Sequence, residues 1–291
     1  MPLSKAEIAA RQIRTALALP AVVDEAMKLS AQPQCDSRRL ADVISKDPVL
    51  ASKLLQLSNS AFFGFSTPTA SIGEAITRLG FPRVRSLAMS ISVGKLFAGA
   101  VPRGDGYTRL NVWRHSVAVG LLGELLARAS PLPAARELTG QALLTGLIHD
   151  LGMILIEQHT HGRYAELAES AQASGVPVHE LEHRKFGYDH MALAAVILTK
   201  WRFPGPIILA VANHHMTTNP DTGDPLSLLA ALAEYMGHRV DVGYSDIPGI
   251  PDESIKNVCG RLNISEPDLD TVRDSFDEQI GGALKIFAVS E

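Results

Sequence analysis

The sequence predicts an all-α protein built from two helical lobes. Apolar residues recur at helical spacing, as in Leu40, Val43 and Ile44, which occupy positions i, i+3 and i+4. Helix-start signals precede several of these runs, whereas alternating apolar and polar segments, which would predict strands, are nearly absent. A stretch rich in glycine and proline at 98–107 divides the helical pattern into two blocks.

In the first block, the expected helices begin at residues that cap helices well. Asp36 precedes the first of them, and Asp47 followed by Pro48 starts the next, because aspartate accepts hydrogen bonds from free amides and proline fits the first helical turn. Ser71 and Glu74 form a capping-box pattern for a third helix. The helices expected in this block span about 36–46, 47–57, 71–79 and 82–97.

The second block reads as a continuous series of helices joined by short turns. A segment with glycine and proline at 240–250 precedes the last two of them. The expected helices span about 109–129, 135–150, 161–174, 178–186, 189–201, 205–215, 225–238, 252–262 and 266–287.

Composition bounds the class of protein. With 291 residues, 46% of them hydrophobic and 20% charged, the chain can bury a substantial core. A net charge of -4 gives no support for a nucleic-acid-binding protein, which usually carries a basic balance. Cys35 and Cys259 lie far apart and show no metal or redox spacing, which favours free thiols in a reducing compartment. We find no signal peptide and no 18-residue apolar run, so we expect a cytoplasmic protein without a membrane span.

An adjacent His149-Asp150 pair stands inside an otherwise apolar helical run, LTGLIHDLGMI over 144–154. A polar pair there costs free energy unless it is hydrogen-bonded or bound to a metal, and imidazole with carboxylate suits a divalent cation. Further residues of ligand type occur on neighbouring helices, at His115, His190, His214, His215 and Glu234. Because metal sites in helical proteins use inward-facing side chains from several helices, we predict that these seven residues converge.

Structural explanations of single members of this set remain open. His149 at the C-terminus of a helix would interact favourably with the helix dipole, and Asp150 would cap the following turn. Adjacent residues project about 100° apart on a helix, so we expect only one of His214 and His215 to point inward.

We expect the remaining histidines to be surface or structural residues. They are His159, His161, His179, His183 and His238. His183 and its neighbour Glu182 rank next as residues near the site. Trp113 and Trp201 are expected to pack in the core.

The order His, His-Asp, His, His-His and a final acid resembles the HD superfamily of metal-dependent phosphohydrolases. The surrounding motifs are most similar to its HDOD (HD-related output domain) branch. They read ISKDPVLASKLLQLSNSAFFG at 44–64, SIGEAITRLGFPRVR at 71–85, LIHDLG at 147–152, FGYDH at 186–190, KWRFP at 200–204 and NHH at 213–215. Together the matches extend from about residue 17 to residue 237, most of the chain.

The resemblance implies an N-terminal helical lobe packed on an HD-like helical lobe. It places the HDOD domain at 17–240, with the two lobes at 17–100 and 108–240. Residues 1–16 would then be an N-terminal extension, and 241–291 a C-terminal helical tail packed on the HD-like lobe. The resemblance also implies a divalent metal, Fe, Mn, Mg or Zn, and it gives ligand positions to His115, His149, Asp150, His190, His214, His215 and Glu234.

Departures from a catalytic branch, the HD-GYP cyclic-di-GMP phosphodiesterases, bear on activity. Their motif His-Asp-x-Gly-Lys reads His149-Asp150-Leu-Gly-Met153 here, so the lysine that would assist a phosphate is lost. Glu234 replaces the final aspartate, and the Gly-Tyr-Pro motif is absent after His215. These departures argue against a cyclic-di-GMP hydrolase.

Two functional hypotheses follow. In the first, which we favour, the protein is a non-catalytic signalling output module that binds regulatory or signalling proteins and keeps a relic, structural or ligand-sensing metal site. In the second, it is a metal-dependent phosphohydrolase acting on a nucleotide or other phosphoester, with Asp150 and His214 as candidate catalytic residues. Loss of the lysine at Met153 favours the first hypothesis, and retention of the ligand set favours the second.

Two further motifs have no place in the metal site. Arg78, Arg83 and Arg85 flank the turn at Gly80 between two short helices, which superficially matches a helix-turn-helix DNA reader. The second helix is too apolar to face a DNA groove, so we expect no DNA binding and assign these arginines to a solvated rim or a docking face. The aromatic segment 59–65 predicts packing between the lobes, with partner or ligand contact as the alternative.

Overall fold

The computed structural model describes residues 3–13, 21–30, 36–59, 67–98, 106–161, 163–215, 224–244 and 252–288. Regular structure in these residues is entirely helical, which confirms the all-α prediction. The elements are α1 (Lys5–Gln12), α2 (Ala21–Ser30), α3 (Ser37–Ile44), α4 (Pro48–Ser58), α5 (Ile72–Leu79), α6 (Phe81–Gly94), the 3₁₀ turn η2 (Lys95–Phe97), α7 (Arg109–Ala129), α8 (Pro133–Arg136), α9 (Thr139–Ile148), α10 (Leu151–His159), α11 (Tyr164–Ser174), α12 (Val178–Phe186), α13 (His190–Lys200), α14 (Gly205–Ala212), α15 (Pro225–Gly237), α16 (Asp252–Leu262) and α17 (Glu266–Ile286). Most of the aromatic segment 59–65 and of the expected boundary at 98–107 lies outside the described residues.

Three of the four helix starts predicted in the first block are confirmed by hydrogen bonds from capping side chains. Asp36 caps α3 and Asp47 caps α4, because each carboxylate accepts hydrogen bonds from backbone N–H groups of the first turn. Ser71 caps α5 in the same way. Glu74, the other half of the expected capping box, accepts instead from the N–H of Ala70, so the box is shifted by one residue.

The second block differs from the prediction in two places, and both affect the site. The expected helix 135–150 is divided into α8 and α9, and an unexpected helix, α10, follows directly after His149-Asp150. The first six residues of α10, 151–156, are all buried, so the segment lacks the amphipathic period that marks a surface helix. The expected helix 205–215 was wrong at its end, because α14 stops at Ala212.

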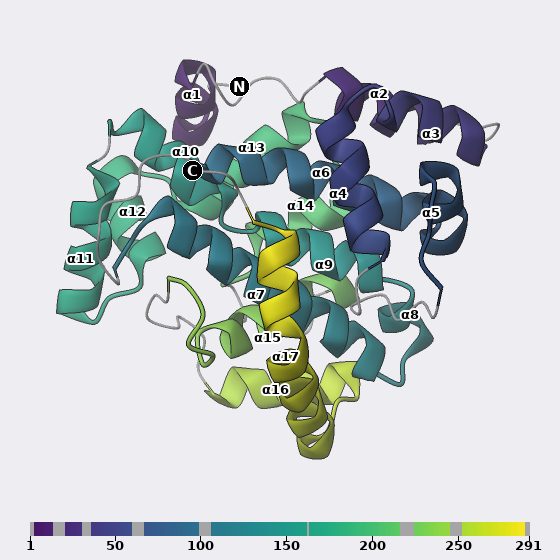
Figure 1. The fold of residues 1–291 in the computed structure, drawn as a ribbon. Coiled ribbons are helices and arrows are strands. Elements are labelled where there is room, and N and C mark those ends of the chain that lie inside the picture. Colours follow the sequence, from purple (N-terminus) through teal and green to yellow (C-terminus); the bar gives the residue numbers. More distant parts are fainter. Residues whose placement is uncertain are drawn as a thin grey trace.

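Figure 1 shows α7 near the centre of the molecule, where it packs against α9, α15 and α17. Helices α2–α6 gather on one side of it, and α10–α13 lie toward the other. The two groups are joined where α6 packs on α9. Helix α1, the first in the sequence, packs on α13, far along the chain.

Two close helix contacts depend on glycine. A Cβ atom at Gly146 would lie 2.5 Å from the Cα of Gly120, where α9 crosses α7. A Cβ atom at Gly152 would lie 1.9 Å from the carbonyl oxygen of His190, where α10 meets the start of α13. Real side-chain atoms do not come this close, so both crossings require a residue without a Cβ. These crossings bring the segment around His149 against α7 and α13.

The C-terminal helices pack on the centre of the molecule. Helix α17 packs on α7, and α16 packs on α15. The indole N–H of Trp113 in α7 donates a hydrogen bond of 2.7 Å to the carbonyl oxygen of Phe287. The ammonium group of Lys53 in α4 donates one of 2.7 Å to the carbonyl oxygen of Ala288. The two residues that follow α17 therefore contact both the first and the second helical block.

Among the residues that the structure describes, one helical run is apolar and long enough to cross a membrane by length and composition. It spans Thr139–His159, which includes α9 and α10, and 83% of its most apolar window is buried inside the fold. Such burial is typical of a core helix, since a membrane span would present its apolar side chains to lipid.

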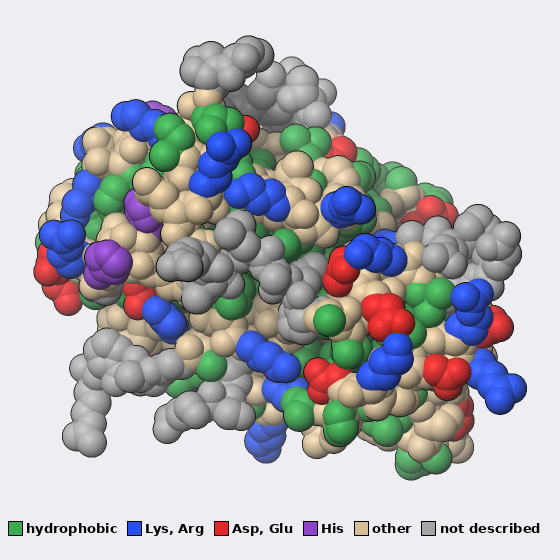
Figure 2. Space-filling model, turned by 90° about the horizontal axis from the view of Figure 1, so that it is seen from above, with side chains coloured by type: hydrophobic (Ala, Val, Ile, Leu, Met, Phe, Trp, Pro, Cys, Tyr) green, Lys and Arg blue, Asp and Glu red, His purple; other side chains and the backbone are tan. Residues whose placement is uncertain are grey.

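The surface and the interior differ in charge and in histidine content. Figure 2 shows Lys, Arg, Asp and Glu side chains scattered over one face among neutral and hydrophobic ones. Five of the ten histidines are buried, although histidine is usually only partly buried. Imidazole groups are therefore concentrated in the core, where polar groups need partners.

Candidate metal centre

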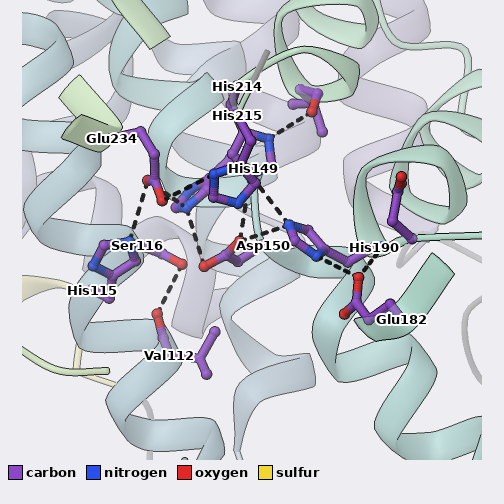
Figure 3. Close-up of polar contacts among 12 residues, drawn as sticks. Val112, His115, Ser116, His149, Asp150, Glu182, His190, His214, His215 and Glu234 are labelled. Carbon is purple, nitrogen blue, oxygen red and sulfur yellow. Dashed lines mark hydrogen bonds and ion pairs between the residues drawn. The ribbon is translucent and has the colours of Figure 1, made fainter. Parts of the chain in front are cut away.

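All seven sequence-predicted residues lie in one buried cluster (Figure 3). None exceeds 8% exposure. The cluster is assembled from α7, the turn between α9 and α10, the first residue of α13, the segment after α14, and α15. These elements contribute, in that order, His115, His149 and Asp150, His190, His214 and His215, and Glu234.

Asp150 is the centre of one half of the cluster. Its Oδ1 lies 3.6 Å from Nε2 of His190 and 3.7 Å from Nε2 of His214, and its Oδ2 lies 3.1 Å from Nε2 of His149. One donor atom from each of Asp150, His190, His214 and His215 falls within 4.8 Å of all the others. Three segments distant in sequence thus present four donor atoms to a common point.

Glu234 is the centre of the other half. Its Oε2 lies 3.1 Å from Nε2 of His149 and 3.3 Å from Nε2 of His115. Its Oε1 lies 2.8 Å from Nε2 of His238, one helical turn further along. His149 contacts both carboxylates, so it connects the two halves.

Hydrogen bonds outside the cluster fix the orientation of three imidazole rings. Nδ1 of His149 lies 2.6 Å from the carbonyl oxygen of Gly146, and Nδ1 of His214 lies 2.7 Å from that of Val211. Nδ1 of His190 lies 2.8 Å from the Glu182 carboxylate. Because these partners are acceptors, Nδ1 carries the proton in each ring and Nε2 is left to face the cluster. Histidines that bind metals are usually oriented in this way.

The structure corrects the expectation that only one of His214 and His215 points inward. Both are buried, and both offer a donor atom to the group around Asp150. The expectation assumed helical geometry, but α14 ends at Ala212, and the pair lies in the turn that follows. Outside a helix, adjacent side chains are not held 100° apart.

The structure also decides against the capping explanation of Asp150. This residue does precede α10, but its side chain makes no capping hydrogen bond to the helix. The carboxylate is directed instead at His149, His190 and His214. The pair therefore belongs to the cluster and is not an ordinary helix boundary.

Three residues near the cluster were not among the predicted ligands. We expected His238 and His179 to be surface or structural residues. His238 contacts Glu234, and the ring of His179 stacks on that of His215 with 4.8 Å between the ring centroids. Glu182, ranked second, is buried and accepts hydrogen bonds from the backbone N–H and ring of His190. The spacing of Glu234 and His238 by four residues could have suggested their contact.

His183 was ranked with Glu182 as a residue near the site, and the structure overturns this. Its side chain is exposed on α12. Glu182 and His183 are adjacent in one helix, where consecutive side chains point about 100° apart, so only the first faces the core.

The pKa values indicate that the buried carboxylates require a nearby positive charge. Burial would raise the pKa of Asp150, but contact with His149 holds it well below its usual value. Burial would likewise raise the pKa of Glu234, yet His149 and His238 hold it well below. For His190, burial is outweighed by Glu182, which raises its pKa to about 9.

Other histidines of the cluster are driven toward the neutral form. Burial lowers the pKa of His214, and it lowers that of His215 well below the usual value. Burial also lowers the pKa of His179 to about 4. Neutral imidazole is the form that binds metal ions, so the rings of His214 and His215 are ready as ligands.

The donor atoms fit a divalent metal ion. Nε2 of His190 and Nε2 of His214 lie 3.3 Å apart, and because both Nδ1 atoms donate elsewhere, two lone pairs meet unless a proton or cation lies between them. Nε2 of His149 and Nδ1 of His215 are buried without a hydrogen bond in good geometry to the described residues. Donor atoms that each lie about 2.1 Å from one ion are separated by roughly 3–4.2 Å. The distances among Asp150, His190 and His214, which are 3.3, 3.6 and 3.7 Å, fall within this range.

Replacing Glu182 with glutamine is expected to weaken metal binding by about 10- to 100-fold. The carboxylate holds the ring of His190 through Nδ1, and the neutral amide would hold it less firmly and make Nε2 a weaker donor. Metal affinity is measured by titration of the metal-free protein with Mn²⁺ or Zn²⁺. Glu180→Gln, an exposed change on the same helix, should leave affinity unchanged, and equal affinities for both variants would contradict the role given to Glu182.

An all-helical fold that brings together His, His-Asp, His, His-His and an acid defines the HD class of metal-centre proteins. A family model described as "HDOD domain" matches residues 17–217 of this chain. The chain belongs to the HDOD domain family.

Solved structures share the fold. An HDOD domain protein with unknown function from Geobacter sulfurreducens superposes with a TM-score of 0.77 at 18% identity, over 97% of this chain and 98% of that one. A Shewanella amazonensis SB2B protein with the provisional name phosphohydrolase superposes with a TM-score of 0.68 at 22% identity, over 96% of this chain and 97% of that one. At these identities the likeness concerns the fold.

A curated relative is an uncharacterized protein of Treponema pallidum. It is 26% identical over 233 residues, which cover 79% of this chain. The chain spans 44% of that relative's length.

Proposed function

We propose that this protein is a signalling output module of the HDOD type, in which the metal centre serves structure or sensing. The observation that carries the proposal is that the cluster is closed. Among the described residues, the cavity between His115, Asp150, Met153 and Glu234 has a volume of about 10 Å³. A space of this size holds an ion or one water molecule, whereas sites for drug-sized ligands have volumes of about 300–1,000 Å³.

The side chain of Met153 supports this reading. It is buried and lines the cavity. At this position the HD-GYP motif has a lysine, whose ammonium group would offset charge on a phosphate. A thioether carries no charge and donates no hydrogen bond. As far as the described residues line it, the cavity therefore lacks both the space and the ammonium group that would favour phosphoester binding.

The metal would act on the fold itself. Its ligands would come from α7, the turn before α10, α13, the segment after α14, and α15, so one centre ties together much of the second helical block. Because only the folded state brings these ligands together, the free energy of metal binding would add to the free energy of unfolding. The nitrogen-rich ligand set favours Fe, Mn or Zn over Mg, which prefers oxygen.

We place this activity in the cytoplasm and assign regulatory or signalling proteins as partners. The mixed charges of the surface in Figure 2 suit protein contacts better than DNA, which selects a basic face. A partner would bind the helical surface, and the state of the metal centre would set the stability of the helices beneath it.

A second function, metal-dependent hydrolysis of a phosphoester, is favoured by one observation. The complete set of seven ligand-type residues is present and converges, with donor atoms that fit a cation. A bound divalent ion would supply Lewis acidity and lower the pKa of a bound water. In that case Asp150 would hold the ion, and His214 would act as the proton donor to the leaving oxygen only when protonated at Nε2 and not bound to the ion.

One experiment separates the two functions. Purified protein is analysed for metal content and then incubated with a panel of nucleotide and other phosphoesters, with and without Mn²⁺. We expect bound metal and no turnover above that of Asp150→Ala. Turnover that needs metal and disappears in both His149→Ala and Asp150→Ala would overturn the output-module proposal, provided that His183→Ala, an exposed change, retains it.

A further inference from the structure

A cavity of about 230 Å³ lies between α6, the start of α9 and the start of α14. Arg83 and Arg85 of α6 line it together with Thr139 and Gly140 of α9. No residue of the metal cluster contributes to its wall. It is therefore a separate site. Its two arginines, Arg83 and Arg85, are among those that we assigned from the sequence to a solvated rim or a docking face.

The guanidinium of Arg85 is available to a ligand. The side chain is half-buried, and burial lowers its pKa with no carboxylate to raise it. Among the described residues the structure gives it neither an ion pair nor a hydrogen-bond partner. Guanidinium carries five N–H donors in a planar fork that matches carboxylate and phosphate oxygens. Removing such a group partly from water without a partner costs free energy that an anion would restore.

Arg83 adds positive charge beside it. Its guanidinium contacts the carboxylate of Glu124, which is fully buried and also contacts Arg128. One negative charge is thus shared between two guanidinium groups, which leaves an excess of positive charge at this wall. Glu137 also lines the cavity, but it is exposed, where water and salt screen its charge.

The first turn of α9 supplies backbone donors at the same wall. No side chain caps this helix, so its first N–H groups have no partner from a cap. A Cβ atom at Gly140 would lie 3.7 Å from the nearest atoms of Arg83, which is ordinary contact. Helix N-termini favour anions, and here the terminus supplements the arginines and the cavity.

The remaining wall is apolar. Leu79, Met89, Leu144 and Ile207 line it opposite the charged groups. The cavity thus offers an anion site next to a hydrophobic surface. Its volume is below the range of pockets for drug-sized ligands, which restricts the occupant to a small molecule.

We propose that this cavity binds a small organic phosphate monoester, with the phosphate on Arg85 and Arg83 and the carbon portion on the apolar wall. The site lies beyond the metal centre described above and does not depend on its chemistry. Helix α9 leads from the cavity to His149, over about 15 Å at 1.5 Å per residue. A ligand here would act on the helix that ends at the metal cluster.

The test uses phenylphosphonate, which cannot be hydrolysed, and inorganic phosphate, each titrated calorimetrically into the full chain. We expect saturable binding that is tighter for phenylphosphonate, because only it reaches the apolar wall. Arg85→Gln should weaken binding by about tenfold or more, since a charge-assisted hydrogen bond is lost. Arg38→Gln, an exposed arginine on α3, should leave it unchanged.

A second variant separates loss of binding from loss of folding. Gly140→Asp places a carboxylate at the N-terminus of α9, where it should abolish phenylphosphonate binding without lowering the thermal midpoint. Absence of saturable binding to the wild type, or equal affinity in Arg85→Gln, would overturn the proposal. So would binding that is lost in Asp150→Ala and kept in Arg85→Gln, because the probe would then occupy the metal centre.

Discussion

Replacing Gly152 with alanine is expected to lower the free energy of unfolding by about 3 kcal/mol or more, a large fraction of the roughly 5–15 kcal/mol by which typical domains are stable. The added Cβ would lie 1.9 Å from the carbonyl oxygen of His190 and 2.6 Å from its carbonyl carbon. These are backbone atoms at the start of α13, and the N–H of the same residue is held by Glu182. Neither helix can yield without moving a ligand of the cluster.

Urea denaturation followed by circular dichroism measures this effect, and other helical glycines provide the control. A Cβ at Gly260 or Gly281 meets no atom within 4 Å. Alanine at either position should leave stability unchanged or raise it by about 0.5–1 kcal/mol, because alanine has the higher helix propensity. If Gly152→Ala were as stable as these controls, α10 and α13 could not approach each other as closely as described.

Replacing Asp150 with alanine is expected to abolish metal binding and, with it, the stabilisation that metal gives. Asp150 contributes a donor atom to the group with His190 and His214 and also to the group with His115 and His149. Its loss therefore affects both halves of the cluster. A metal at 100 times its Kd stabilises the wild type by about 2.7 kcal/mol, and the variant should gain nothing.

This second result is read from the metal content of the purified proteins and from unfolding curves with EDTA and with added Mn²⁺. His183→Ala removes an exposed histidine and should keep the metal-dependent shift. An Asp150→Ala protein that still bound metal with unchanged affinity would exclude Asp150 as a ligand. If neither EDTA nor added metal changed the free energy of unfolding of the wild type, a structural role for the metal centre would be excluded.

The elements that the sequence predicted well are those with one buried face. Asp36, Asp47 and Ser71 cap α3, α4 and α5 as expected, because capping is a local interaction between residues two or three apart. Helix α10 was missed because its apolar residues do not alternate with polar ones. A helix surrounded by protein has no solvent-facing side, and so it has no periodic signal.

The candidate ligands could be chosen from sequence because they are polar residues in apolar surroundings. His149 and Asp150 interrupt a buried run, and Glu234 lies on a helix that is almost wholly buried upstream. Their convergence depends on crossings that local sequence does not reveal. Gly146 and Gly152 allow α9 and α10 to approach α7 and α13, and only the tertiary contacts identify these two glycines as essential.

Only the tertiary structure could show which individual histidines belong to the cluster. Only one of His214 and His215 was expected to point inward, but both do so because α14 ends before them. His238 reaches Glu234 from the end of α15, and Glu182 fixes the ring of His190 from another helix. These contacts depend on where helices end and how they cross, and neither follows from residue type.

By itself, the sequence determined the all-helical class, the principal helix starts and the set of seven ligand-type residues. Helix propensity, capping and the cost of burying polar groups depend on residues close together in the chain, so they can be predicted from the sequence. The tertiary structure alone decided that both His214 and His215 face Asp150 and that Arg85 lines a separate cavity. It also decided that the cavity beside Asp150 and His215, as the described residues line it, holds little more than an ion. Those features arise from packing between segments distant in the chain, which sets the space left between side chains.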